Sequence, residues 1–152
     1  MTAFVDTNVL VRHLTGDPPA MAKRATAFLA SQPELYLADL IVAETVYVLE
    51  SFYKAPRDQV ATAMRSLISM RSMITVDPAL LLRAIEVYEV DRLDFAEAYL
   101  VACAETAGVS TIASFDKAID RVTTVTEWSL DPSRVVDRHI RGRGPAAFRL
   151  TG

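Results

Sequence analysis

The sequence contains little cysteine and histidine, which limits the chemistry that it can carry. Its single cysteine, Cys103, cannot form a disulfide within the chain, and its alanine neighbours predict a small buried side chain and not a nucleophile. The two histidines, His13 and His139, lie far apart in the sequence, which argues against a general acid–base mechanism built on a histidine pair. The composition therefore gives no support to cysteine or histidine catalysis.

Long apolar runs are also missing. Charged residues such as Asp39 and Glu44 interrupt the apolar stretches well before the roughly 20 residues that cross a bilayer. The N-terminal residues show neither the basic region nor the apolar stretch of a secretory signal, which predicts a cytoplasmic protein with no membrane partner. Glycine and proline are sparse, at 5 and 7 of 152 residues, and a hydrophobic content of 51% predicts a folded globular chain.

Most of the chain also lacks an excess of basic residues. The net charge of −3 argues against strong nonspecific binding of nucleic acid. Residues 131–152, however, contain five arginines against two aspartates, a local charge of +3 that leaves −6 for residues 1–130. We predict one domain over residues 1–130, followed by a flexible basic tail over residues 131–152.

Short apolar segments alternate with amphipathic segments of helical period. Strands are expected at residues 4–5, 35–37, 74–76, 109–113 and 122–126. Helices are expected at residues 8–14, 20–30, 40–53, 57–70, 78–90 and 94–106. This order predicts an α/β fold, a three-layer α/β/α arrangement around a mostly parallel sheet of four to five strands.

Acidic residues stand at the ends of the expected strands and in the first turns of the helices that follow. They are Asp6, Glu44, Asp94, Glu97 and Asp116. In an open parallel sheet, ligands bind beyond the carboxyl ends of the strands, so these carboxylates are expected to converge there. Hard cations such as Mg²⁺ or Mn²⁺ prefer oxygen ligands, and the set therefore predicts a metal site.

Each acid also has a purely structural interpretation. Asp6 can cap the helix that follows it, and Asp116 can form a turn. Asp94 and Glu97 have the spacing of a capping box, whereas Glu44 lies on an apolar helix where an unpartnered buried carboxylate would be costly. Glu44 is therefore expected to have a cation nearby. Asp39 is expected to cap the same helix.

Four segments, taken in order, resemble the motifs of PIN-domain nucleases, and most closely those of the toxins of VapBC toxin–antitoxin pairs. The segments are Val5-Asp6-Thr7-Asn8-Val9-Leu10, Ala43-Glu44, Asp94-Phe95-Ala96-Glu97-Ala98-Tyr99-Leu100-Val101-Ala102-Cys103-Ala104, and Ala113-Ser114-Phe115-Asp116. The resemblance spans roughly residues 3 to 127. The four motifs in this order are specific, although the first would be weak by itself.

The resemblance implies roles for particular residues. Asp6, the acid of the third motif and Asp116 would hold the metal, and Glu44 would act directly or through a bound water. Asn8 and Ser114 would contact the metal-binding carboxylates, not the metal itself, and so fix the orientation of these carboxylates. The family usually has Asp where this chain has Glu97, so either the longer Glu97 reaches the ion or Asp94 takes part of its role.

The function that the resemblance implies is hydrolysis of RNA by metal-activated water, with Mg²⁺ or Mn²⁺ as cofactor. The implied partners are an RNA substrate, a small cognate antitoxin and a second copy of the chain in a homodimer. Basic residues outside the acidic set are expected to attract the RNA, and the tail is expected to tether it. These residues are Arg12, Lys23, Arg24, Lys117, Arg121 and the arginines of residues 131–152.

Two other functions fit parts of the pattern. A non-catalytic Mg²⁺-binding α/β regulatory or interaction module would have adjacent acids after its first strand, but Asp6 has no acidic neighbour. A phosphatase that forms an aspartyl-phosphate usually has an Asp-x-Asp motif, but here position 8 is Asn.

Overall fold

The computed structural model describes residues 2–134, and the predicted tail lies outside this range except for its first four residues. The strands are β1 (Thr2–Phe4), β2 (Glu34–Tyr36), β3 (Met73–Ile74), β4 (Thr111–Ser114) and β5 (Thr126–Ser129). The α-helices are α1 (Thr7–Thr15), α2 (Pro19–Ser31), α3 (Asp39–Ser51), α4 (Arg57–Ile68), α5 (Pro78–Glu86) and α6 (Phe95–Ala107). Shorter helical turns are η1 (Val87–Asp91), η2 (Lys117–Arg121) and η3 (Pro132–Arg134).

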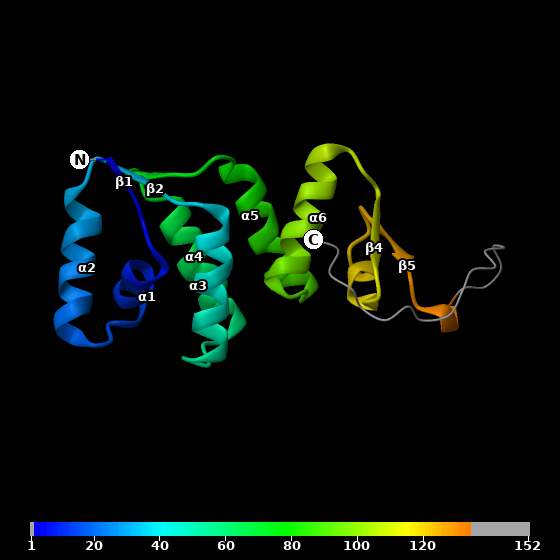
Figure 1. Ribbon diagram of the computed structural model, residues 1–152, viewed down its shortest axis with the longest axis horizontal. Coiled ribbons are helices and arrows are strands. Elements are labelled where there is room, and N and C mark those ends of the chain that lie inside the picture. The colour runs from blue at the N-terminus through cyan, green and yellow to red at the C-terminus, as the bar shows by residue number, and fades with distance from the viewer. Residues whose placement is uncertain (1, 135–152) are drawn as a thin grey trace, which may run out of the picture.

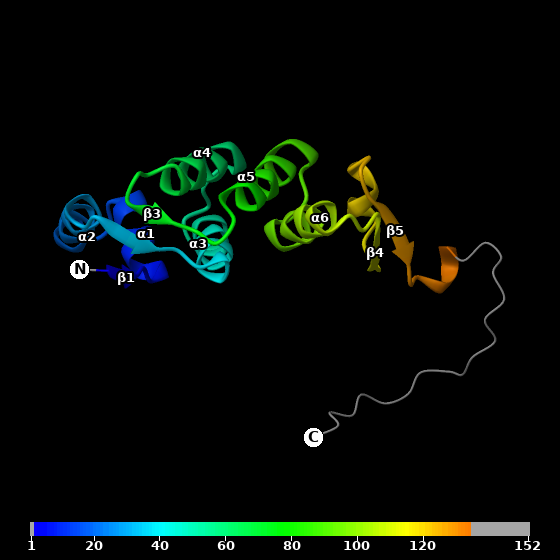
Figure 2. The same ribbon diagram turned by 90° about the horizontal axis from the view of Figure 1, so that it is seen from above.

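All strand pairs of the described residues are parallel, which confirms the predicted α/β class. The strands do not form one sheet, however: β1, β2 and β3 form one in that order, and β4 pairs with β5 in a second. In both views the β1–β2–β3 sheet and the β4–β5 pair lie toward opposite ends of the molecule, with α3, α5 and α6 between them (Figures 1 and 2). Each predicted strand overlaps an observed one, the last only at Thr126, but the single predicted sheet is divided.

Local signals in the sequence set the helix ends. The side chain of Asp6 caps α1 and that of Asp94 caps α6, while Gly16 and Gly108 end these helices in the left-handed conformation that glycine adopts without strain. The end of α6 at Gly108 agrees with the helix predicted to end at residue 106. The predicted capping role of Asp39 is wrong, because the N-cap of α3 is Ala38 and Asp39 is already helical.

The last strand lies further along the chain than predicted. β5 begins at Thr126, whereas the valines that indicated a strand, Val122 and Val125, are buried in the core from the loop before it. Val122 donates its backbone N–H to Ile119 and so closes the preceding turn instead of joining a ladder. A run of valines predicted burial correctly but not the hydrogen-bonding partner.

The core joins α3, α4, α5 and α6. Tyr88, Leu81 and Ile85 are almost fully buried from the α5 side, and Ala98, Val101 and Ala102 pack there from α6. The small side chains of α6 allow its close contact with α5. Ile112 and Ile119 extend the same cluster to the β4–β5 pair.

A charged cluster links the loop before β5 to these helices. Arg83 on α5 makes a bidentate salt bridge to Glu105 on α6, with hydrogen bonds of 2.9 Å from Nε and 3.0 Å from Nη2. Glu105 also accepts a hydrogen bond from Thr124. The Arg83 guanidinium holds the pKa of Glu105 below its usual value.

Among the described residues, no helix is both long enough and apolar enough to cross a bilayer.

The Glu105→Gln variant is expected to lower the free energy of unfolding at pH 7 by about 1 kcal/mol, since the pair is partly solvent-screened. A carboxyl whose folded pKa is depressed stabilises the fold above its unfolded pKa of 4.5, and this contribution disappears as pH falls through the folded value. Urea titrations of both proteins at pH 7 and at about pH 3 measure this. A gap between the two proteins that stays constant with pH would contradict the assignment.

Candidate acidic site

The first group of acids lies at the carboxyl end of β1. Asp6 is exposed and caps α1: its side chain accepts hydrogen bonds from the Asn8 backbone N–H at 3.4 Å and from Asn8 Nδ2 at 3.5 Å. The structure therefore places Asn8 beside the carboxylate that it was predicted to orient. One oxygen of Asp6, Oδ2, makes both of these bonds.

Glu44 adjoins this group from α3. Its Oε2 accepts a hydrogen bond of 2.5 Å from the hydroxyl of Thr7, a buried residue next to Asp6 in the sequence. The inference that Glu44 is a buried carboxylate without a partner is wrong, since the residue is exposed and has a hydrogen-bond partner. The apolar residues around it in the sequence face the core, while position 44 lies on the open side of the helix.

The second group lies where α6 begins and β4 ends. Asp94, Glu97 and Asp116 interact here: burial, a hydrogen bond to Asp116 and the negative charges of Asp94 and Asp116 together raise the pKa of Glu97 to about 7. A backbone hydrogen bond from Asp94 acts in the opposite direction. A bound cation would relieve the mutual repulsion of these carboxylates.

Ser114 and Asp116 are joined by a tight turn. The Ser114 hydroxyl oxygen accepts a hydrogen bond of 2.9 Å from the Asp116 backbone N–H, and Asp116 in turn accepts one of 2.9 Å from Ala118. Ser114 thus fixes the backbone of Asp116, which is consistent with its predicted supporting role. The turn-forming interpretation of Asp116 also holds, because its side chain caps η2.

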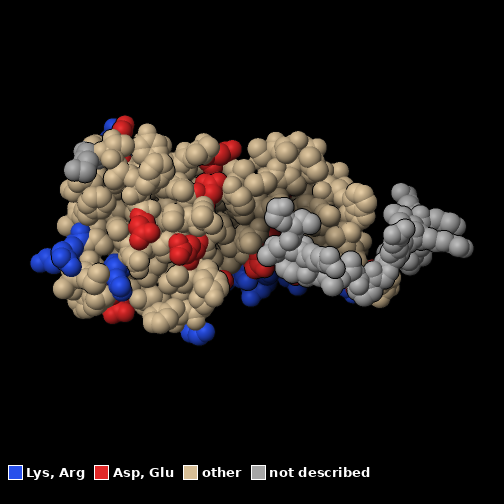
Figure 3. All heavy atoms as spheres, viewed as in Figure 1, with Lys and Arg blue, Asp and Glu red and all other residues tan. Residues whose placement is uncertain are grey.

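The structure keeps the two groups apart. Asp6 follows β1 and Asp116 follows β4, and these strands lie toward opposite ends of the molecule (Figures 1 and 2). On the face drawn in Figure 3, acidic side chains stand at several separate places and not in one patch. Within residues 2–134, no three Asp, Glu, His or Cys side chains are arranged to hold a metal ion. Carboxylate oxygens suit a hard cation, but the described residues of a single chain do not bring these carboxylates together.

Two contacts that position the second group gave no sign in the sequence. Arg57 on α4 donates through Nη1 to the carbonyl oxygen of Tyr88 at 2.6 Å and to that of Leu93, directly before Asp94, while its guanidinium lies 4.3 Å from the centre of the Tyr88 ring. Tyr99 on α6 donates to Asp39 on α3 at 2.5 Å. Both contacts link residues far apart in the chain, and no local spacing predicts them.

Basic side chains lie beside the first group. Arg12 and Arg24 line a mostly apolar groove between α1 and α2, together with Asn8, Met21 and Phe28. Figure 3 shows Lys and Arg side chains at the end of the molecule formed by these two helices. Arg12 and Arg24, which are predicted to attract phosphate groups, therefore lie close to Asp6.

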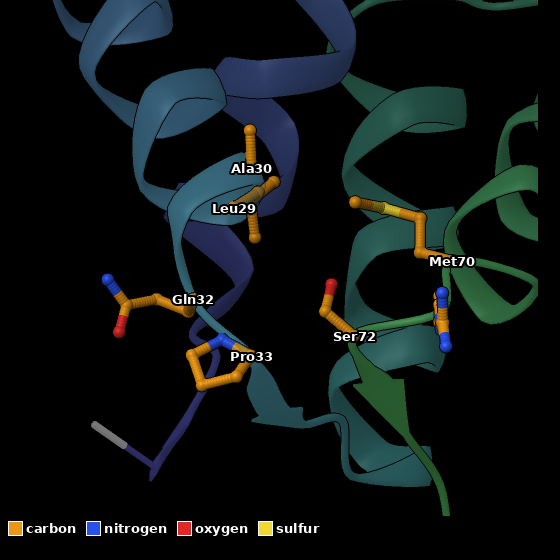
Figure 4. Close-up of a pocket in the computed structure, with 7 residues that line it drawn as sticks. Leu29, Ala30, Gln32, Pro33, Met70 and Ser72 are labelled. Carbon is orange, nitrogen blue, oxygen red and sulfur yellow. The ribbon is translucent and has the colours of Figure 1, made fainter.

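A different hollow has no acidic lining. Gln32, Pro33, Met70 and Ser72 surround it, and they precede β2 and β3, so it opens at the amino ends of these strands (Figure 4). Ligands of parallel sheets bind at the carboxyl ends, which is where Asp6 lies. The acidic groups therefore remain the candidate site.

Removing the cap of α6 tests the structural role of Asp94. Its Oδ1 accepts a hydrogen bond of 2.8 Å from the Glu97 backbone N–H, so Asp94→Ala should lower the free energy of unfolding by about 1 kcal/mol. Asp94→Asn keeps a capping oxygen and should unfold almost like the wild type in urea. Equal stability of all three proteins would show that the cap contributes nothing.

The parallel strands, with carboxylates beyond β1 and β4 and at the start of α6, define an α/β protein in which the acids come from separate segments. The chain belongs to the PIN domain family, which matches its residues 3–125.

Among solved structures, the chain is similar to the toxin VapC20 of Mycobacterium tuberculosis, described as cleaving the sarcin–ricin loop. The sequence identity is 21% and the TM-score 0.39, over 78% of this chain and 92% of that one. No curated protein matches the sequence.

Proposed function

We propose that the protein is a ribonuclease that depends on Mg²⁺ or Mn²⁺ and forms the toxin component of a type II toxin–antitoxin pair. The observation that carries the proposal is membership of the PIN domain family together with the placement of Asp6 and Asp116 directly beyond parallel strands. A cytoplasmic site of action remains a prediction.

In this proposal the carboxylates of Asp6, Asp116 and Glu97 or Asp94 hold the cation, and Glu44 assists. A bound divalent cation supplies a water molecule of lowered pKa and offsets charge on the phosphate. Asn8 and Ser114 orient the acids: one hydrogen-bonds the side chain of Asp6, and the other fixes the turn that carries Asp116. No protein nucleophile is required, in agreement with the scarcity of cysteine and histidine.

Arg12 and Arg24 would supply the attraction that the acidic groups cannot. Their groove lies beside Asn8, so a phosphate backbone bound there would pass close to Asp6. Single-stranded or looped RNA fits this role best, since its splayed bases leave the scissile phosphate reachable. The basic residues 135–152, outside the described part of the chain, remain predicted to tether the RNA.

The antitoxin is proposed to be a small protein with an apolar segment and a basic residue that pairs with the acids. The groove between α1 and α2 offers apolar contacts through Val9, Met21 and Phe28. Leu40 and Tyr47 on α3 are 77% and 69% exposed and would extend that surface.

Metal removal tests the activity directly. The purified protein should cleave single-stranded RNA in the presence of Mn²⁺, lose this activity in excess EDTA and regain it when Mn²⁺ is restored. A DNA strand of the same sequence serves as the control for substrate choice. Binding of Mn²⁺ without cleavage of any RNA tested would instead support the non-catalytic module.

A further inference from the structure

A further hollow lies between α3 and the start of α6. One face of α3 lines it at the helical spacing of three and four residues, and the cap and first turn of α6 close it. The residues that matter here are Ala43, Val46, Tyr47, Glu50, Asp94 and Phe95. The volume of the hollow is about 270 Å³. Small-molecule sites begin at about 300 Å³, so the hollow suits one flat ring system rather than a larger ligand.

The hollow adjoins both acidic groups. Tyr47 follows Glu44 by about one turn of α3, so the two side chains share a side of the helix. Asp94, which belongs to the second group, lines the hollow directly. A nucleotide whose phosphate lies at either group can therefore place its base in the hollow.

Aromatic rings form two walls of the hollow. Phe95 is only 5% exposed, and the centre of its ring lies 6.2 Å from that of Tyr88 and 6.4 Å from that of Tyr99. This wall is therefore held in place by its neighbours. Tyr47 is 69% exposed, so its ring can lie against a flat ligand. Aromatic side chains are the usual stacking partners of unpaired RNA bases.

Glu50 supplies a polar group in a fixed position. Its Oε1 accepts a hydrogen bond from the hydroxyl of Tyr88, whose side chain is almost fully buried. Arg57 lies over the same Tyr88 ring, so the donor that orients Glu50 is itself held from the other side. Each carboxylate oxygen can accept two hydrogen bonds, so both oxygens of Glu50 can still accept from a ligand in the hollow.

A carboxylate beside a stacking ring favours one of the four RNA bases. The pairing edge of guanine carries two adjacent donors, N1–H and N2–H, and a carboxylate can accept both at once, as it does from an arginine. Adenine and cytosine have an acceptor nitrogen beside their amino group, and uracil has a single N–H between two carbonyl oxygens. The lone pairs of these acceptors repel a carboxylate, so guanine is the base that fits Glu50.

We propose that the hollow between α3 and α6 binds a guanine base of single-stranded RNA, with Tyr47 stacked on the face of the base and Glu50 accepting hydrogen bonds from its pairing edge. The role of this RNA as a substrate rests on the proposed function, whereas the binding of guanine does not. Tyr47 also belongs to the surface proposed for the antitoxin, so an antitoxin bound there would cover the hollow.

Binding in the presence of EDTA tests the role of Glu50 without cleavage. The labelled RNA strands UUGUU and UUAUU are titrated with the full chain, and fluorescence anisotropy gives their dissociation constants. The guanine strand should bind at least about tenfold more tightly, which is the discrimination that one bidentate contact provides. Equal binding of the two strands, or binding of neither, would overturn the proposal.

Glu50→Gln should abolish the preference for guanine, because the amide replaces one acceptor with a donor. The remaining oxygen can still accept from Tyr88, so the fold should be kept. Glu34→Gln is the matched control: it removes the same charge at an exposed position of β2, and it should keep the preference. A preference that survives in Glu50→Gln would show that Glu50 does not read the base.

The stacking contact is tested at Tyr47. Tyr47→Ala should weaken binding of the guanine strand by at least about fivefold, which is the lower end of what one stacked base contributes. Tyr47→Phe keeps the ring and should bind as the wild type does. Circular dichroism checks that both variants are folded. Unchanged affinity in Tyr47→Ala would contradict the assignment of the hollow to a base.

Comparison with the cleavage assay separates failure of this inference from failure of the proposed function. A guanine preference that depends on Glu50, in a protein that cleaves no RNA, would retain the guanine site and reject the ribonuclease. Metal-dependent cleavage by a protein that binds both strands equally would reject the guanine site and retain the ribonuclease.

An arginine side chain also offers two adjacent N–H donors to a carboxylate, so a short peptide with one arginine is titrated as well. Binding of this peptide that depends on Glu50, together with a wild type that does not distinguish the two RNA strands, would assign the hollow to a protein partner and overturn the proposal.

Discussion

Asp6→Asn is expected to reduce metal-dependent RNA cleavage by at least about 100-fold while leaving the fold intact, since an amide is a poor substitute for a charged oxygen ligand. Asparagine caps helices as well as aspartate does, so the start of α1 should be preserved. The rate is measured on single-stranded RNA across a Mn²⁺ titration, and the urea midpoint is measured on the same sample.

Asp58→Asn provides the matched control for Asp6→Asn. Asp58 is an exposed acid in the first turn of α4, outside both acidic groups, and its replacement removes the same charge. The control should retain wild-type cleavage. Equal rates for Asp6→Asn and wild type, with the same Mn²⁺ dependence, would show that Asp6 holds no catalytic cation.

The second large effect is expected at Glu97. Glu97→Gln keeps the length of the side chain but removes the charge that interacts with Asp94 and Asp116, so RNA cleavage should fall by at least about tenfold with little change in the free energy of unfolding. Removing one of three clustered acids should, if anything, relieve repulsion in the protein without metal.

Glu97→Asp keeps the carboxylate but shortens the side chain, so it tests whether activity needs only the charge or also the length of Glu97. It restores the residue that the family usually has at this place, and it should recover a substantial part of the activity lost in Glu97→Gln. Full activity of Glu97→Gln would assign the third acid to Asp94, and loss of activity in Asp94→Asn would then confirm that assignment.

Sequence patterns predicted the order of the elements and the local surroundings of most acids. Helix caps depend on residues within one turn of each other, so Asp6, Asp94 and Gly108 could be placed from local sequence. Burial also followed from apolar character, as at Val122 and Val125. These are properties that neighbouring residues determine.

Partners across the fold could not be predicted in the same way. The exposure of Glu44 depends on which side of α3 faces the core, and its bond to Thr7 joins two helices. The division of the strands into two sheets depends on where α6 lies between β1 and β4. The sequence of an apolar strand does not specify which other strand will pair with it. The separation of the two acidic groups follows from that division.

The contacts of Arg57 widen the set of positions on which the acidic site depends. One guanidinium nitrogen, Nη1, donates to the carbonyl oxygens of two residues, and the planar guanidinium also lies over an aromatic ring. Lysine has a compact ammonium group without that plane and cannot reproduce the contact with the ring. The tolerance of the site to natural variation is therefore set partly in α4, by a residue that touches neither metal nor RNA in any arrangement proposed for them. A search restricted to acidic residues would not identify Arg57.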